Sequence, residues 1–271
     1  MNTKKLLFTI TVILLVIAFA VSAFLVGNYI VESKNQKDRN DQLANMVSQA
    51  QTTPSTKQPE TKPAPTTEET TQATTEPTEP SIKKEYQEIY DTNNDMAGWI
   101  QIENTRINYP VMQTPNDPDY YLYRDFDKKD SKHGTIYARG DADLSKPSDN
   151  ITIFGHNMAD GSMFATLNNY TQKSTWENNP MIFFNTLYEY HTYKIFAVFK
   201  TTANLGEGYF GYHKFVDGTE AEFNDFVKTC KNLSFYDTGI TPVYGDKLIC
   251  LSTCEYTQDN GRLVVAAVRI A

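Results

Sequence analysis

The chain has 271 residues, of which 40% are hydrophobic and 21% charged, and its 25 basic against 33 acidic side chains give a net charge of −8. This acidic balance argues against a nucleic-acid-binding protein, because such proteins carry a clustered basic face. The 17 tyrosines and 15 phenylalanines exclude a collagen, a coiled coil or a wholly disordered chain, and the length accommodates one or two domains.

An uncharged apolar run follows a short N-terminus. Residues 6–27 carry no charged side chain, and about 20 apolar residues suffice for a helix to cross the hydrocarbon core, whereas a signal-peptide core is typically about 7–15 residues long. Lys4 and Lys5 precede the run, and basic residues stay on the cytoplasmic side. We therefore predict a cytoplasmic N-terminus at 1–5 and an uncleaved transmembrane signal-anchor at 6–27. A cleaved signal peptide, cut after Val21-Ser22-Ala23, is the alternative.

Residues 28–81 are predicted to be an extracellular, Thr/Pro-rich tether. Within them, residues 51–81 are rich in Thr, Pro and Glu and hold no large apolar or aromatic residue. This composition does not bury enough apolar surface to offset the entropy of folding, so we expect an extended, disordered segment. We interpret it as a spacer that holds the following domain off a membrane or through a wall.

The composition changes at residue 82, and residues 82–271 are predicted to form a single domain. Short β-rich runs separated by turn-forming pieces dominate it, which favours a mostly β class, a barrel or a sandwich, with peripheral helices. Strands are expected at residues 99–102, 107–112, 134–137, 151–154, 181–184, 193–199, 247–251 and 263–270. Helices are expected at 82–90, 162–170 and 219–233, the last opening with a Thr219-x-x-Glu222 capping box.

The three cysteines cannot build a disulfide framework, and their odd number leaves at least one thiol free. Cys230 lies on the apolar stripe of the helix at 219–233 and is expected to be a small core residue. Cys250 and Cys254 share a predicted strand, which puts their Cα atoms about 13 Å apart, too far for a disulfide. Apolar character stops at Leu251, so we expect Cys254 at the strand end, partly exposed, where a thiol can act as a nucleophile.

One histidine and one arginine are placed to act with this thiol. His156 ends the predicted strand at 151–154, which would fix the position of its imidazole, whereas the other histidines are interpreted as surface or loop residues. Arg262 follows the turn at 259–261, so its guanidinium can reach the same end of the sheet as Cys254, where it would favour a thiolate or stabilise an oxyanion. No His or Cys stands at metal-ligand spacing from His156, so no metal is expected. Each residue alone also fits an ordinary structural role.

Together these residues resemble the sortases, the cysteine transpeptidases of Gram-positive surfaces. The resemblance is carried by Leu251-Ser252-Thr253-Cys254, by the arginine eight residues later, and by Gly155-His156-Asn157-Met158 upstream. Further stretches are similar to class B sortases: WI at 99–100, INYPV at 107–111, YYL at 120–122, DGSMF at 160–164 and CEY at 254–256. The resemblance covers about residues 82–271, in order.

The resemblance implies a closed β-barrel in which His156, Cys254 and Arg262 meet at one groove. Cys254 would attack the carbonyl of a threonine in a C-terminal sorting motif to give a thioester, and His156 would protonate the departing amine and deprotonate the incoming one. Arg262 would hold the substrate backbone and the developing oxyanion. The residues flanking the cysteine, Ser252 and Glu255, are implied to contact the peptide. The family requires no cofactor.

The partners implied are surface proteins that carry a sorting motif, a peptidoglycan precursor or cross-bridge amine, and the membrane, but no nucleic acid. The expected location is the cell membrane, with a single span and the C-terminal domain outside. In this family the segment before the cysteine strand also walls the groove, to which Tyr209 or Tyr212 could contribute. Two other functions remain open: a secreted cysteine peptidase that transfers the acyl group only to water, and a non-catalytic anchored β-domain that binds a surface ligand.

Overall fold

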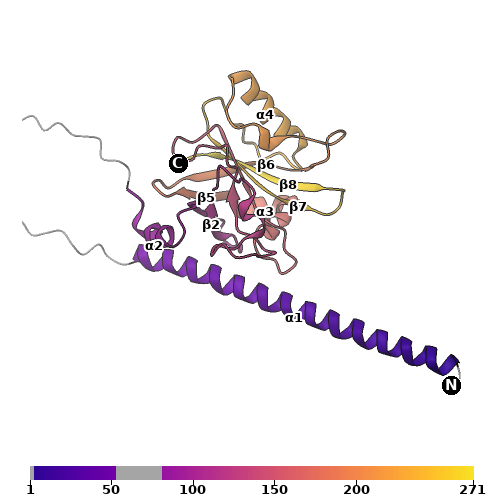
Figure 1. Ribbon diagram of the computed structural model, residues 1–271. Coiled ribbons are helices and arrows are strands. Elements are labelled where there is room, and N and C mark those ends of the chain that lie inside the picture. Colours follow the sequence, from indigo (N-terminus) through magenta and orange to yellow (C-terminus); the bar gives the residue numbers. More distant parts are fainter. Residues whose placement is uncertain (1–2, 53–80) are drawn as a thin grey trace, which may run out of the picture.

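The computed structural model describes residues 3–52 and 81–271 (Figure 1). The domain is a closed barrel with the strand order β1-β2-β3-β4-β7-β8-β6-β5. Each predicted strand overlaps an observed strand, with shifted ends, although the strand expected at 134–137 shares only Tyr137 with β3. The strands are β1 (Met96–Gln101), β2 (Asn108–Met112), β3 (Tyr137–Ala138), β4 (Asn150–Phe154), β5 (Met181–Thr186), β6 (Thr192–Thr202), β7 (Leu248–Glu255) and β8 (Gly261–Arg269).

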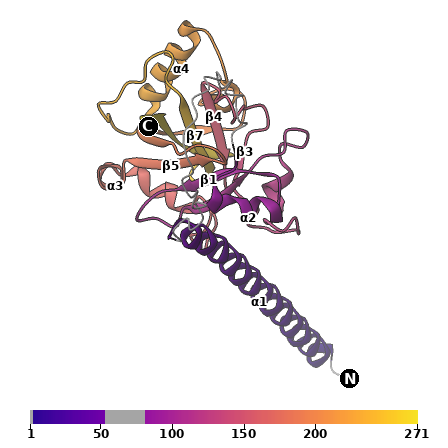
Figure 2. The same ribbon diagram turned by 90° about the vertical axis from the view of Figure 1, so that its left-hand side faces the viewer.

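Helices surround the barrel. They are α1 (Thr3–Thr52), α2 (Lys84–Thr92), α3 (Lys173–Asn178) and α4 (Glu220–Leu233), together with the 3₁₀ helices η1 (Tyr120–Tyr123), η2 (Ala165–Thr171) and η3 (Tyr212–Lys214). The predicted capping box of α4 is confirmed, because Thr219 N donates to Glu222 Oε2 at 2.8 Å and Glu222 N donates back to Thr219 Oγ1. The helix expected at 162–170 is instead the 3₁₀ helix η2. In two views, α4 and α1 lie on opposite sides of the barrel (Figures 1 and 2).

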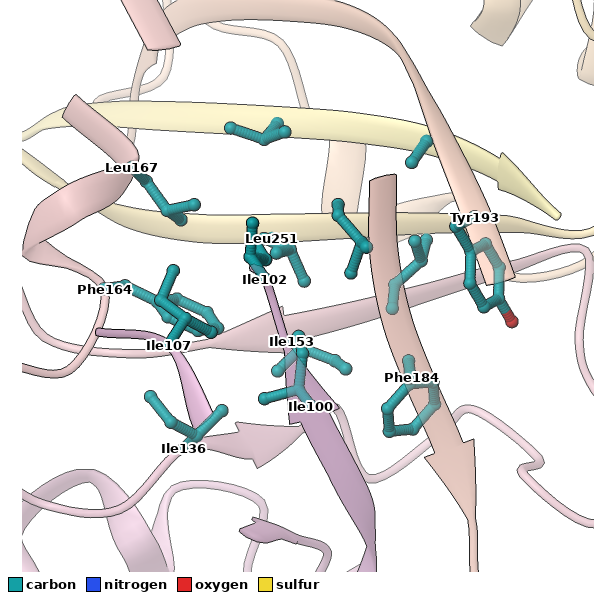
Figure 3. Packing of buried hydrophobic residues seen from close by; sticks show 14 of the residues in the cluster. Ile100, Ile102, Ile107, Ile136, Ile153, Phe164, Leu167, Phe184, Tyr193 and Leu251 are labelled. Carbon is teal, nitrogen blue, oxygen red and sulfur yellow. The ribbon is translucent and has the colours of Figure 1, made fainter. Parts of the chain in front are cut away.

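The core has an inner and an outer layer because the side chains of a strand alternate between its two faces. Ile153 of β4 and Leu251 of β7 point into the barrel, where they meet Ile100 and Phe164 (Figure 3). Cys250, one residue earlier on β7, lies instead in the outer cluster, under the apolar face of α4. Even-numbered residues of β7 therefore face the outside of the barrel, and this alternation decides which way residue 254 points.

Helix α1 is much longer than the sequence predicts. Within the described residues it contains the one stretch that is long and apolar enough to cross a membrane, but the helix continues without a break to Thr52. Residues 28–52, which we expected to belong to an extended tether, are therefore helical. Leu43 and Val47 are buried in a cluster with Tyr86 and Ile89 of α2, so this half of α1 is part of the folded domain. The rest of the expected tether, residues 53–80, lies outside the described residues.

Candidate active site

Three neighbouring strands place the candidate catalytic residues in one row. β4 and β7 pair in parallel with Phe154 opposite Ser252, and β7 and β8 pair antiparallel with Cys254 opposite Arg262. His156 lies two residues beyond Phe154, so the same register carries it beside Cys254. Because adjacent strands are about 4.8 Å apart, His156, Cys254 and Arg262 form a row across the outer face of the barrel.

The segment after β4 is fastened to the strand that carries the cysteine. Thr253 Oγ1 donates to the Gly155 carbonyl at 2.7 Å, and Asn157 Nδ2 donates to the Cys254 carbonyl at 2.9 Å. Both neighbours of His156 are thus bound to β7. A site held by sheet and by side-chain hydrogen bonds is positioned more tightly than one on a free loop.

Gly155 has no room for a side chain. A Cβ there would lie 2.4 Å from Ile136 Cδ1 and 2.8 Å from the buried ring of Phe164. We expect Gly155→Ala to lower the free energy of unfolding by about 1–3 kcal/mol through overpacking, and to lower kcat/KM about 100-fold because His156 would be displaced. Urea unfolding and a peptide-cleavage assay measure the two effects.

Gly239→Ala is the control for this change. Gly239 has a φ of 72° but open space around it, so alanine should cost about 1 kcal/mol of backbone strain and leave the activity unchanged. Wild-type activity in a folded Gly155→Ala protein would show that the position of His156 does not depend on this close approach.

The imidazole of His156 is held by η1, the 3₁₀ helix that follows β2. Its Nε2 lies 2.7 Å from the Leu122 carbonyl oxygen, which can only accept, so Nε2 donates and carries a proton. The Tyr123 ring lies 5.6 Å from the imidazole, tilted by 38°. Among the described residues no hydrogen bond to Nδ1 is seen, so Nδ1 is the nitrogen that can take up or deliver a proton.

Of the three free cysteines, only Cys254 reaches solvent; Cys230 and Cys250 are buried. Burial raises the pKa of both buried thiols, which keeps them protonated and unreactive. The sequence prediction of one accessible thiol at a strand end is therefore confirmed, although β7 extends beyond Leu251 to Glu255.

The row opens into a pocket of about 310 Å³, which His156, Cys254 and Arg262 line together. Its other lining residues are Asp119, Leu122, Thr135, Tyr137, Phe154, Gly155, Ser252 and Thr253. Arg262 Nη1 donates to the carbonyls of Asn260 at 3.2 Å and Gly261 at 2.9 Å. No ion pair to Arg262 is found among residues 3–52 and 81–271, so its positive charge is available to a bound group.

A second hollow of about 410 Å³ adjoins the first and shares Asp119, Tyr137, Phe154 and Arg262 with it. The remaining lining residues are Pro115, Pro118, Arg139, Gly140, Asp141, Thr202, Ala203, Tyr209, Phe210, Tyr212 and His213. The two hollows make a continuous groove with an aromatic wall. Such a groove suits an extended peptide, whose apolar side chains pack on rings while a few polar groups fix its direction.

Ser252 and Glu255, the two residues expected to contact substrate, lie on opposite faces of β7. Ser252 faces the groove, with its Oγ 2.6 Å from the Tyr212 hydroxyl. Glu255 is buried on the other face, where its Oε1 accepts a hydrogen bond from Lys200 Nζ at 2.8 Å. Burial alone would raise the pKa of Glu255, but hydrogen bonds, the strongest from Lys200, lower it, so this carboxylate is an ion pair within the fold. The structure brings Ser252 into the site but not Glu255.

One further pair of polar groups in the site, Tyr137 and Asp119, was not singled out from the sequence, whereas Tyr212 was named as a possible wall of the groove. Tyr137 Oη donates to Asp119 Oδ1 at 3.2 Å, at the point where the two hollows meet. Tyr212 is buried, which raises its pKa to about 12 and keeps its hydroxyl protonated beside Ser252. Asp119 comes from a loop far from Cys254 in sequence, and no local pattern marked it.

Comparisons with known proteins agree with this architecture. The family model described as "Sortase domain" matches residues 100–270. Sortase B of Listeria monocytogenes is 33% identical over 189 residues, which cover 68% of this chain and 73% of that protein. Sortase B of Staphylococcus aureus is 27% identical over 188 residues, 69% of this chain and 75% of that protein. The Staphylococcus aureus sortase B–substrate complex matches 89% of this chain and 98% of its own with a TM-score of 0.71; at 23% identity it shows the shared fold.

Proposed function

Because the chain belongs to the sortase family, and within it to class B, whose members are cysteine transpeptidases, we propose that Cys254, His156 and Arg262 are its catalytic residues. The observation that carries the proposal is the row that these residues form across β4, β7 and β8, open to a single pocket. Neighbours in such a row can act on the same carbonyl group.

The first half-reaction forms a thioester. Cys254 Sγ gives its proton to His156 Nδ1, and the resulting thiolate attacks the carbonyl carbon of a threonine in the sorting motif. The oxyanion that develops faces the guanidinium of Arg262. When the intermediate collapses, the peptide C–N bond breaks and the departing amine takes a proton from His156. The hydrogen bond to Leu122 occupies Nε2, so the proton leaves from Nδ1.

The second half-reaction reverses these roles with a new amine. His156 Nδ1 takes a proton from the amine as its nitrogen attacks the thioester, a C–N bond forms, and the C–S bond breaks to restore the thiolate. We assign the amine to a peptidoglycan precursor or cross-bridge. The product is then a surface protein joined to the wall by an amide.

The adjoining hollow is the proposed site for the sorting peptide. Phe210, Tyr209 and Tyr212 offer apolar faces, and Ser252 offers a hydroxyl already oriented by Tyr212. We propose Ser252 as a contact to the peptide backbone. The pairing of Glu255 with Lys200 does not favour a direct contact of Glu255 with the peptide.

Sortases act at the cell surface, and the apolar stretch of α1 fits a membrane anchor. We propose residues 1–5 as the cytoplasmic end and 6–27 as the span, because Lys4 and Lys5 flank it on that side. The catalytic domain, residues 82–271, then lies outside as part of a single-pass membrane protein.

Mass spectrometry of the full chain in detergent, incubated with a library of threonine-containing sorting peptides, tests the proposal. We expect a peptide acyl adduct on Cys254 that an added amine discharges as an amide. Release of free acid alone, even with excess amine, would identify a peptidase. No adduct with any peptide would favour a non-catalytic binding domain.

A further inference from the structure

The part of α1 that follows the apolar span contacts the domain almost at once. The Tyr29 ring stacks on the His133 ring, with centroids 6.1 Å apart and planes within 18°. One turn later, Ser33 Oγ donates to the Asp160 carboxylate. The proposed span ends at Gly27, and the chain stays uncharged until Glu32, so no free linker separates the span from the folded domain.

The contact continues along the helix. Lys132 N donates to Glu32 Oε1 at 2.7 Å, and the Arg39 guanidinium pairs with Asp127 at 2.5 Å. Further along, the apolar side chains of α1 enter the cluster beneath α2. Polar contacts near the span and apolar contacts near Thr52 fix both ends of this segment, which makes it a rigid extension of the domain.

Asp160 joins the helix to the catalytic segment. It lies four residues after His156, and its Oδ2 accepts from the fully buried His133 Nε2 at 3.0 Å as well as from Ser33. Burial alone would raise the pKa of Asp160, but hydrogen bonds led by those of Ser162 hold it well below its usual range. One carboxylate thus accepts hydrogen bonds from both the anchor helix and the barrel.

The helix also sets the height of the catalytic domain above the bilayer. At about 1.5 Å per residue, Ser33 lies about 9 Å beyond the end of the span, close to the outer edge of a headgroup layer about 5–7 Å thick. The β7–β8 hairpin points toward the side of the molecule from which the N-terminal half of α1 emerges, and the C-terminus lies at the opposite side (Figure 1). The catalytic end of the barrel is therefore the end nearer the membrane.

We propose that residues 28–52 are a rigid strut that seats the catalytic domain on the outer membrane surface, with the catalytic end of the barrel toward the lipid headgroups. The inference rests on the proposed anchor at 6–27. The strut precedes residues 53–80 in the chain, so that segment does not set the distance of the domain from the bilayer. Substrates then meet the enzyme at the membrane surface.

A depth measurement tests this. The full chain with Cys254→Ala is reconstituted in nanodiscs that contain a headgroup-labelled quencher lipid, and a fluorophore is attached at Lys132→Cys or, as the matched control, at Val243→Cys. Both positions are exposed, and Val243 precedes β7 at the opposite end of the barrel. We expect quenching at least about threefold stronger at position 132 than at position 243.

Two changes in the length of the chain distinguish a rigid strut from a flexible spacer. Replacing residues 53–80 with a Gly/Ser linker of about half that length should leave the quenching at position 132 unchanged. Inserting seven helix-forming residues after Gly27 should reduce it, because the domain rises by about 10 Å. Equal quenching at both positions, or quenching that follows the length of the linker, would overturn the proposal.

The outcomes also distinguish failure of the strut proposal from failure of the proposed transpeptidase function. The Cys254→Ala chain measures depth whether or not transpeptidation occurs. A chain that is not recovered in nanodiscs would contradict the anchor itself, and with it the strut.

Discussion

Replacing Cys254 with alanine is expected to abolish peptide cleavage and wall attachment together, with a loss of about 10,000-fold or more in kcat/KM. The thioester requires a sulfur at this position, and the other two thiols are buried and protonated. Cys254 lies outside the buried clusters, so the free energy of unfolding should change by less than about 1 kcal/mol. Cleavage of a fluorogenic sorting peptide and urea unfolding of the same sample measure both quantities.

Cys230→Ala is the matched control. Its sulfur lies on the buried face of α4, so the substitution should lower stability by about 1–2 kcal/mol and leave kcat/KM unchanged. Opposite outcomes for the two cysteines would separate a catalytic thiol from a packing one. If wall attachment persists in the Cys254→Ala protein, the nucleophile lies elsewhere and the proposed mechanism is wrong.

Replacing His156 with glutamine is expected to lower kcat about 100- to 10,000-fold, with a much smaller change in KM. The glutamine amide can still donate to the Leu122 carbonyl, so η1, which holds the imidazole, keeps its contact. Glutamine has no group that exchanges a proton near neutral pH, so it can neither protonate the departing amine nor deprotonate the incoming one. Steady-state kinetics with and without an added amine acceptor measure both half-reactions.

His191→Gln is the control for this change. His191 is a buried histidine beside Glu189 and Arg269, but it lies at the other end of the barrel. Its substitution should leave kcat unchanged. A His156→Gln enzyme with a rate close to that of the wild type would show that His156 carries no proton in either step.

The strands could be predicted because their signal is local. Alternating or continuous β-branched and aromatic residues, bounded by turn residues, marked each strand of the barrel, and the capping box marked α4. Strand ends were less certain. β7 continues past Leu251 because polar Ser252 and Thr253 pair with β8 and also find hydrogen-bond partners in Tyr212 and Gly155. Such partners lie far away in the sequence.

The extent of α1 was missed for a different reason. Its buried face consists of Gln36, Asn40, Leu43 and Val47, spaced four, three and four residues apart as on one face of a helix. Two of the four side chains are polar, so an apolar stripe was not apparent. The spacing was nevertheless present, and it was the signal that could have found the strut.

The residues of the candidate site could be predicted from the sequence, but the face of the strand to which each side chain points could not. Cys254, His156 and Arg262 were predicted from the sequence as candidate site residues, and the register of three strands brings them together. Glu255 was assigned to the groove because the resemblance implied that the residues flanking the cysteine contact the peptide. Once β7 includes Glu255, alternation sends this side chain to the face opposite Cys254.

The parallel pairing of β4 with β7 has a consequence for folding. The contact between Gly155 and Thr253 spans 98 residues, so the imidazole meets the thiol only after a long loop has closed, and such nonlocal pairings form slowly. The β7–β8 hairpin is also the part of the barrel that is synthesised last. A partly synthesised or partly exported chain therefore carries the Cys254 thiol without the His156 imidazole beside it. The enzyme becomes active only when its last strand is in place.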